Sequence, residues 1–308
     1  MWTRSATAAL LVGCGFLNLA GSMRMARAGA PEAPLFKPRN LGAAEVPLPE
    51  GIAEADYVVV GKVVGVEDKT VSASPFPGSP AKIAYRVVTV KPTEVLHGDP
   101  AVKEIRLGFI PRESYKLDGS GVPTPAVPWP QTTVFKVGQE GLLFVKKHHQ
   151  ESFQVKFAPF LGFIPKEDGD FRKTVDHARK LAALLKDPTA ALKADNAANR
   201  FLAATMLIHA YRPYEVKGQE RRETPVDAAV SKLLLKALTE ADWRDDHRLV
   251  DVYPPHPYRL FQRLGVTKAD GYDPPAVADI QTTLNATLKW LQDNEGKYAV
   301  KRSEAKGR

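Results

Sequence analysis

The sequence contains one cysteine, Cys14, among its 308 residues. This cysteine lies in an apolar segment close to the N-terminus, so a chain that is cleaved beyond this segment contains none. Neither a disulfide framework nor a cysteine-based zinc site can then form. The class of small secreted domains that depend on disulfides is therefore excluded.

The sequence also lacks a long apolar run, since no window reaches the roughly 18 apolar residues that a transmembrane helix needs. The N-terminus instead has the layout of a secretory signal, with Arg4 before an apolar run over residues 6–20 and small residues after it. Two processing sites fit this layout: cleavage after Ala28, which we favour, and lipidation of Cys14 in the lipobox-like sequence LVGC. We predict an exported protein, periplasmic or extracellular, that carries a lipid anchor if Cys14 is the site used.

The positive charge is concentrated at the two ends of the chain. The formal net charge is +8, of which three charges leave with the leader, and residues 297–308 carry five Lys/Arg against one Glu. The part between them is near neutral, whereas a nucleic-acid binder carries its charge on a folded face with aromatic partners. We therefore expect no nucleic-acid partner and interpret the tail as a solvated, frayed terminus.

The first half of the chain carries the signals of β-strands. Valine dominates residues 56–68, and Gly61 and Gly65 lie within this stretch, where an absent side chain permits a sharp coil or a bulge. Five short strands with one long, coiled first member are typical of a small closed or partly closed barrel. The other four strands are predicted over residues 82–99, 103–110, 133–147 and 152–158.

The second half shows helical periodicity. Residues 171–186 place apolar side chains at three- and four-residue steps, and residues 195–212 continue this character with Asp195 or Asn196 as the N-cap. Thr224 followed by Pro225 predicts the start of a further helix, which runs to Trp243. Two more helices are predicted, a short one over residues 258–264 and a long one over residues 275–294.

Three motifs of the first half, ADYVVVGKVVGV, TEVLHG and VGQEGLLFV, combine a valine-rich strand, a strand end and a glycine-flanked turn. With these motifs the first half resembles the netrin/tissue-inhibitor-of-metalloproteinase type of OB-fold domain. The resemblance implies an OB-like β-barrel. The inhibitory members of that family use an N-terminal cysteine that has no counterpart here, so no functional residue carries over.

The motifs ANRFLAATMLIHAYR and LLLKALTEADW of the second half resemble helices of HEAT-like repeats. A short HEAT-like array is therefore one expectation, and a compact bundle is the other, because stacked helix pairs need about three units to bury a continuous core. The leader, barrel and helices together resemble secreted bacterial proteins of unassigned function. We predict an α+β chain with two domains: a signal peptide at 1–28, a Pro/Ala-rich linker at 29–51, a five-stranded OB-like β-barrel at 52–165, an α-helical domain at 170–296 and a basic tail at 297–308.

Candidate catalytic and metal-binding residues are few. His148 and His149 follow a strand, where adjacent side chains point to opposite faces and cannot close on one ion, so we expect a solvated turn. The acidic residues 242–247 lack the spacing of a known ligand motif and are interpreted as a solvated helix end. The motifs KEDGDF and KADGYD predict turns rather than calcium loops. We assign no catalytic, metal-binding or cofactor-binding residue.

Aromatic side chains in and beside the proline-rich loop 111–131 are candidates for a ligand-binding lip, since OB-type barrels bind through a strand face and loops. We favour a competing role, in which these side chains pack the loop onto the barrel. We predict a non-enzymatic binding or scaffolding protein of the cell envelope that uses no cofactor and contacts another envelope or extracellular protein through the barrel face and this loop. Two alternatives stay open: an inhibitor of an extracellular protease, and a hydrolase with its site in the interdomain cleft. The four aromatic residues are Phe109, Tyr115, Trp129 and Phe135.

Overall fold

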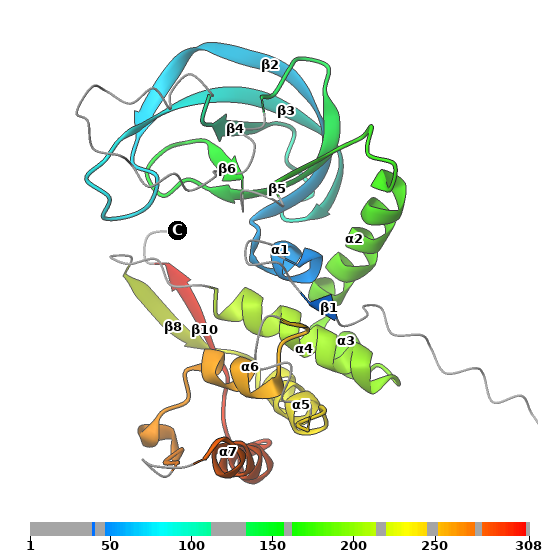
Figure 1. Ribbon diagram of the computed structural model, residues 1–308, viewed down its shortest axis with the longest axis vertical. Coiled ribbons are helices and arrows are strands. Elements are labelled where there is room, and N and C mark those ends of the chain that lie inside the picture. Colours follow the sequence, from blue (N-terminus) through cyan, green and yellow to red (C-terminus); the bar gives the residue numbers. More distant parts are fainter. Residues whose placement is uncertain are drawn as a thin grey trace, which may run out of the picture. The chain divides into compact units, whose positions relative to one another are not determined.

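The computed structural model describes residues 39–40, 47–111, 134–156, 162–213, 220–244, 252–274 and 279–305 (Figure 1). Within these ranges the chain is α+β, with a six-stranded mixed sheet, two further two-stranded pairings and seven α-helices. Sheet and helices belong to one unit of the chain, Ala33–Arg308. Among the helices of the described ranges, none is long and apolar enough to cross a membrane.

The sheet contains the five strands that the sequence predicts. Its order is β2-β3-β4-β6-β5-β7; the β4–β6 pair is parallel, the other pairs are antiparallel, and β5 also pairs with β2. The hydrogen-bonded pairing therefore returns from β5 to the first strand of the sheet. The strands are β2 (Tyr57–Ala73), β3 (Ile83–His97), β4 (Ile105–Phe109), β5 (Glu140–Lys147), β6 (Gln154–Lys156) and β7 (Phe163–Pro165), which pairs with β5.

Strand β2 is long because it pairs with two other strands, β3 and β5. It pairs with β5 over residues 57–62 and with β3 from Val58 to Ala73, and its register against β3 shifts in four places. At Gly61 an added Cβ would lie 2.8 Å from Val90 Cγ1, so glycine is needed for the close approach of β2 and β3. Gly65 also lies at a register shift, but its Cβ would have no neighbour closer than 4.0 Å. The register shifts confirm the predicted irregularity at these glycines. The glycine residue itself is sterically required at position 61.

The start of β2 is buried on both faces, as its run of valines predicts. Val59 and Val63 pack into a core formed by side chains of β3, β4 and β5. Val58 belongs to a second core, in which Phe144 of the sheet packs against the helices α1 (Leu48–Glu54), α2 (Phe171–Lys186) and α4 (Ala197–Tyr211). The helices that cover this face of the sheet are visible in Figure 1. One strand thus joins the interior of the sheet to the helical part of the chain.

The helices follow the predicted periodicity, although several of their ends differ from the predicted ones. The predicted bounds of α2 are confirmed, and the side chain of Asn196 accepts the N–H groups of Ala198 and Asn199 as the N-cap of α4. The long C-terminal helix begins, within the described residues, at Ile280 with Asp279 as its cap. The helices are α1 (Leu48–Glu54), α2 (Phe171–Lys186), α3 (Pro188–Leu192), α4 (Ala197–Tyr211), α5 (Ala228–Thr239), α6 (Pro257–Leu264) and α7 (Ile280–Asn294).

The predicted helix start at Thr224 and Pro225 is wrong. Both residues lie in strand β8 (Arg221–Pro225), which pairs with β10 (Lys301–Ala305), and α5 begins at Ala228 with Asp227 as its cap. A Thr-Pro pair also suits the end of a short edge strand, because proline lacks the N–H group that an inner strand needs. The same pairing corrects the frayed-tail prediction, since residues 301–305 form a strand.

The predicted linker at 29–51 also contains ordered elements. Strand β1 (Arg39–Asn40) pairs with β9 (Val252–Tyr253), and α1 begins at Leu48 with Pro49 in its first turn. Seven residues are too few to establish a helical period, and the proline and glycine of α1 concealed it. This short helix positions the site described next.

Candidate functional site: a cleft between the sheet and the helices

A cleft of about 1070 Å³ lies between the sheet and the helical part. Its walls are the ends of β5 and β6, the loop around Phe76, helices α1 and α4, and the paired strands β8 and β10. Basic side chains are frequent on these walls, whereas the carboxylates Glu50 and Glu54 lie on α1. We call the part of the cleft at α1, where Glu54 is buried, its closed end, and the rest, where Asp56 and Glu304 accompany the basic side chains, its opening.

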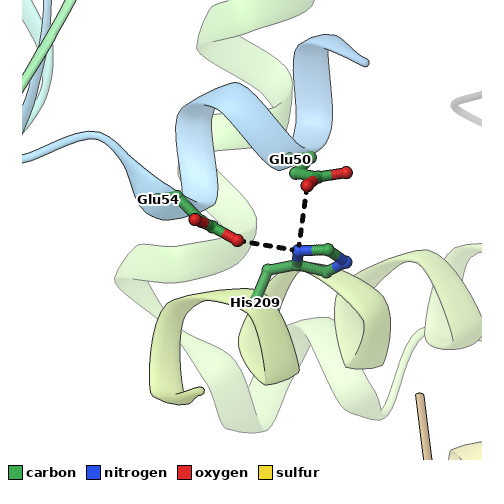
Figure 2. Close-up of side chains that lie close together, drawn as sticks. All are labelled: Glu50, Glu54 and His209. Carbon is green, nitrogen blue, oxygen red and sulfur yellow. Dashed lines mark hydrogen bonds and ion pairs between the residues drawn. The ribbon is translucent and has the colours of Figure 1, made fainter. Parts of the chain in front are cut away.

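Figure 2 shows the closed end, where two turns of helix meet. Glu50 and Glu54 are four residues apart on α1 and share one face of it, and His209 lies in the last turn of α4. His209 Nδ1 lies 3.1 Å from Glu54 Oε1 and 3.6 Å from Glu50 Oε1. Because an ionised carboxylate only accepts hydrogen bonds, Nδ1 carries the hydrogen and donates it to Glu54.

Glu54 is surrounded by cations although its side chain is only 2% exposed. Arg263 of α6 forms an ion pair with Glu54 Oε1, and Lys146 Nζ of β5 lies 3.8 Å from Glu54 Oε2. Burial raises the pKa of this carboxyl group, but the hydrogen bond from His209 and the charges of Arg263, His209 and Lys146 outweigh it. The pKa of Glu54 consequently lies below its ordinary value of 4.5.

The donor atoms of Glu50, Glu54 and His209 lie within 4.8 Å of one another, a spacing that would suit a small divalent cation. Their neighbours argue against a metal. Arg263 and Lys146 both form ion pairs with Glu54, and these two cations match the charge of the two carboxylates, so a divalent ion would bring an uncompensated double charge into a buried place. The chemistry of the site fits an ion-pair network that joins α1, β5, α4 and α6.

His148 forms part of the opposite wall and has a structural role. Its Nδ1 accepts the N–H groups of Gln150 and Glu151 at 3.2 and 3.1 Å, so Nε2 carries the hydrogen and donates it to Ser74 O at 2.9 Å. Burial lowers its pKa, which favours the neutral ring. The expectation that His148 and His149 point apart in a solvated turn is wrong: β5 ends just before them, and their rings lie 4.4 Å apart with His148 buried.

Two of the four aromatic candidates are described, and both pack in the core of the sheet. Phe109 and Phe135 are 5% and 3% exposed, their ring centroids lie 5.5 Å apart, and Phe135 also contacts Phe163. Tyr115, Trp129 and Cys14 lie outside the described residues. The predicted contact surface on the loop therefore rests on Tyr115 and Trp129 alone.

The remaining sequence candidates lie at turns or at a helix end. The Asp-Gly pairs do form turns, at residues 166–170 and at the 3₁₀ helix Lys268–Asp270, which confirms that prediction. In the acidic run, Asp242 accepts a hydrogen bond from Arg244 Nε at 3.2 Å, and residues 245–247 lie outside the described part of the chain.

Sequence reasoning missed Glu50, Glu54, His209 and Arg263. The network joins residues 155 and 209 positions apart, so no local pattern contains it. One signal was present: His209 interrupts the apolar run LAATMLIHAY, and a histidine in a buried helix needs a polar partner.

Comparison with known proteins does not assign the cleft to a family. No protein-family model matches the chain, and no curated protein matches it either. The function of the cleft is therefore inferred from the side chains that line it.

Proposed function

We propose that the chain is an exported binding protein that holds a partner in the cleft without transforming it. The observation that carries this proposal is the contrast between the two parts of the cleft. Glu54, His209 and Arg263 satisfy one another at the closed end, so their role is to hold the walls together. The opening offers basic side chains and an exposed aromatic ring, Phe76, to an incoming molecule.

We further propose that the sheet over residues 52–165 is an OB-like β-barrel. The parallel β4–β6 pair and the return of the pairing from β5 to β2 support this interpretation. Side chains of α3 to α7 contribute to a single hydrophobic core, which supports a compact bundle rather than a linear array of repeats. Export and attachment to the cell envelope rest on the leader, which lies outside the described residues.

A site-specific photo-crosslinker tests the binding proposal. We would place p-benzoylphenylalanine at Phe76, which lines the cleft and is 56% exposed, and at Val137, which is 64% exposed and lies elsewhere, as a matched control. Each full-length variant is irradiated in the envelope fraction of its source, and the adducts are identified by mass spectrometry. The proposal predicts one recurrent protein adduct at position 76 and none at 137. Equal labelling at both positions, or none at 76, would contradict it.

A further inference from the structure

We infer that the partner enters the cleft as an extended, acidic polypeptide segment that adds to β10 as a third strand. This inference rests on the proposed function, because it names the kind of partner that the cleft holds. Three features support it: the pairing of β8 with β10, the position of β10 in the cleft and the charge of the surrounding walls.

The pairing leaves one edge of β10 without a strand neighbour. Strands β8 and β10 form a two-stranded antiparallel sheet in register from Arg221↔Ala305 to Pro225↔Lys301. Within the described residues, β10 pairs with no other strand. A two-stranded sheet presents rows of backbone N–H and C=O groups at its edges, and such rows pair readily with another chain.

The hydrogen bonds next to this sheet identify which groups of β10 point outward. Val226 N–H donates to Val300 O at 2.7 Å, while Val300 N–H donates to Ser231 Oγ at 3.1 Å, so residue 300 occupies a hydrogen-bonded position opposite residue 226. Hydrogen-bonded and non-hydrogen-bonded pairs alternate along an antiparallel ladder. The N–H and C=O groups of Lys301, Ser303 and Ala305 therefore point away from β8. Ser303 O accepts Arg221 Nη2 at 3.2 Å, and this carbonyl keeps a second lone pair for another donor.

This outward edge borders the cleft. Arg302, Ser303 and Glu304 all line the cleft, although successive side chains of a strand point to opposite faces. Three consecutive residues line one space when the backbone of the strand, and not only one of its faces, borders it. Figure 1 shows β10 on the side of the pair nearer α4, and Arg302 lies 4.7 Å above the ring of Tyr211 at the end of that helix.

The size and charge of the cleft indicate what the added strand carries. A volume of about 1070 Å³ lies at the upper end of small-molecule pockets, and β10 spans about 17 Å as an extended strand. An extended peptide fits these dimensions. Lys147, Lys156 and Arg302 are on the walls, whereas the deepest carboxylate, Glu54, is already paired with cations. Arg302 already lies 3.9 Å from Glu304, and acidic side chains on the incoming strand would lie near these three cations and complement their positive charge.

The test measures peptide binding to the full-length protein by fluorescence anisotropy. The probe is a fluorescein-labelled peptide of alternating Glu and Thr, about ten residues long, which covers the five residues of β10 with room at each end. Two control peptides change one property each: Lys replaces Glu in the first, and the central amides are N-methylated in the second. We expect the acidic probe to bind at least about tenfold more tightly than either control.

A matched pair of variants tests the edge itself. Ser303→Pro removes an outward N–H group but no hydrogen bond to β8, so the β8–β10 ladder is retained, whereas Ser303→Ala keeps the N–H group and removes only the hydroxyl. We expect Ser303→Pro to bind the probe at least about tenfold more weakly than Ser303→Ala. A circular dichroism melt of both variants verifies that the fold is intact. If Ser303→Pro melts early, N-methylation of the probe provides the same test in the wild-type chain.

The outcomes separate this inference from the proposed function. Equal binding of the acidic and N-methylated probes, or full binding by a folded Ser303→Pro, overturns strand addition. Tighter binding of the basic control overturns the acidic partner. Either result leaves the proposed function in place if the crosslinker at Phe76 still captures a recurrent protein. Absence of that adduct overturns the proposed function, whatever the peptides do.

Discussion

The two ends of the cleft use charged residues in opposite ways. At the closed end Glu54 is buried, contacts His209 and Arg263, and ties together elements that are far apart in the sequence. At the opening Arg302 and Glu304 are about half exposed and 3.9 Å apart, a geometry that contributes little to stability in water. Charged residues therefore stabilise the fold where they are buried at the closed end, and they remain accessible to a partner where they are exposed at the opening.

The largest expected effect is that of Glu54→Ala. Removing this carboxylate leaves Arg263 and His209 buried without their shared acceptor, which we expect to lower the free energy of unfolding by about 3–5 kcal/mol. Urea denaturation followed by circular dichroism measures the change. Glu304→Ala is the control from the opening, with an expected change below about 0.5 kcal/mol. Similar losses in the two variants would show that the ends of the cleft do not differ in the way described.

His209 provides a smaller test of the same network. His209→Leu removes one of the donors to Glu54 and leaves Arg263 as the donor to Oε1, whereas His209→Asn places an amide N–H near the position of Nδ1. We expect His209→Leu to be less stable than His209→Asn by about 1–2 kcal/mol in urea denaturation. If Asn gave no advantage over Leu, the hydrogen bond would not be the important interaction of this histidine.

The pH dependence of stability follows from the direction of the Glu54 pKa. Because this pKa lies below its ordinary value of 4.5 in the folded chain, the unfolded chain binds a proton first as the pH falls. The contribution of Glu54 is therefore complete above about pH 4.5 and is lost as the pH falls through the lower, folded value. Glu54→Gln should show a shallower loss of unfolding free energy between these two values, measured by urea denaturation at a series of pH values. Parallel curves for wild type and variant would contradict the assignment.

The smallest expected effect concerns zinc. Since Arg263 and Lys146 already form ion pairs with Glu54 at the closed end, we expect zinc to change the melting temperature by less than about 1 °C. Differential scanning fluorimetry with and without zinc measures this. A clear rise that disappears in His209→Leu would turn the ion-pair network into a metal site.

The same contrast explains which parts of the structure the sequence could predict. Strands β2, β3 and β5 and helices α2 and α4 were predictable, because each is long enough to repeat its own period of apolar residues. Helix α1 has seven residues including a proline and a glycine, and β8 and β10 are polar strands that pair across more than 70 positions. Their structure depends on tertiary partners, which no local period can indicate.

The candidate site was hidden for a related reason. Its residues come from α1, β5, α4, α6 and the two paired strands, which are widely separated in the sequence. The prediction for Phe109 and Phe135 rested on their position beside a loop, and their burial depends on contacts across the sheet. His209 was the one local clue, because a polar residue in an apolar helix requires a partner that only the fold can supply.

The central claim is that a partner strand docks on the outward edge of β10, and amide exchange at Ser303 tests it most directly. The N–H group of Ser303 points away from β8, so it should exchange quickly in the free chain, while Arg302, which faces β8, exchanges more slowly. Hydrogen–deuterium exchange followed by nuclear magnetic resonance would be recorded with and without the alternating Glu-Thr peptide at saturating concentration. If a strand adds to β10, the peptide slows exchange at the Ser303 N–H group by at least about tenfold. Unchanged exchange at Ser303 with the peptide bound would contradict it.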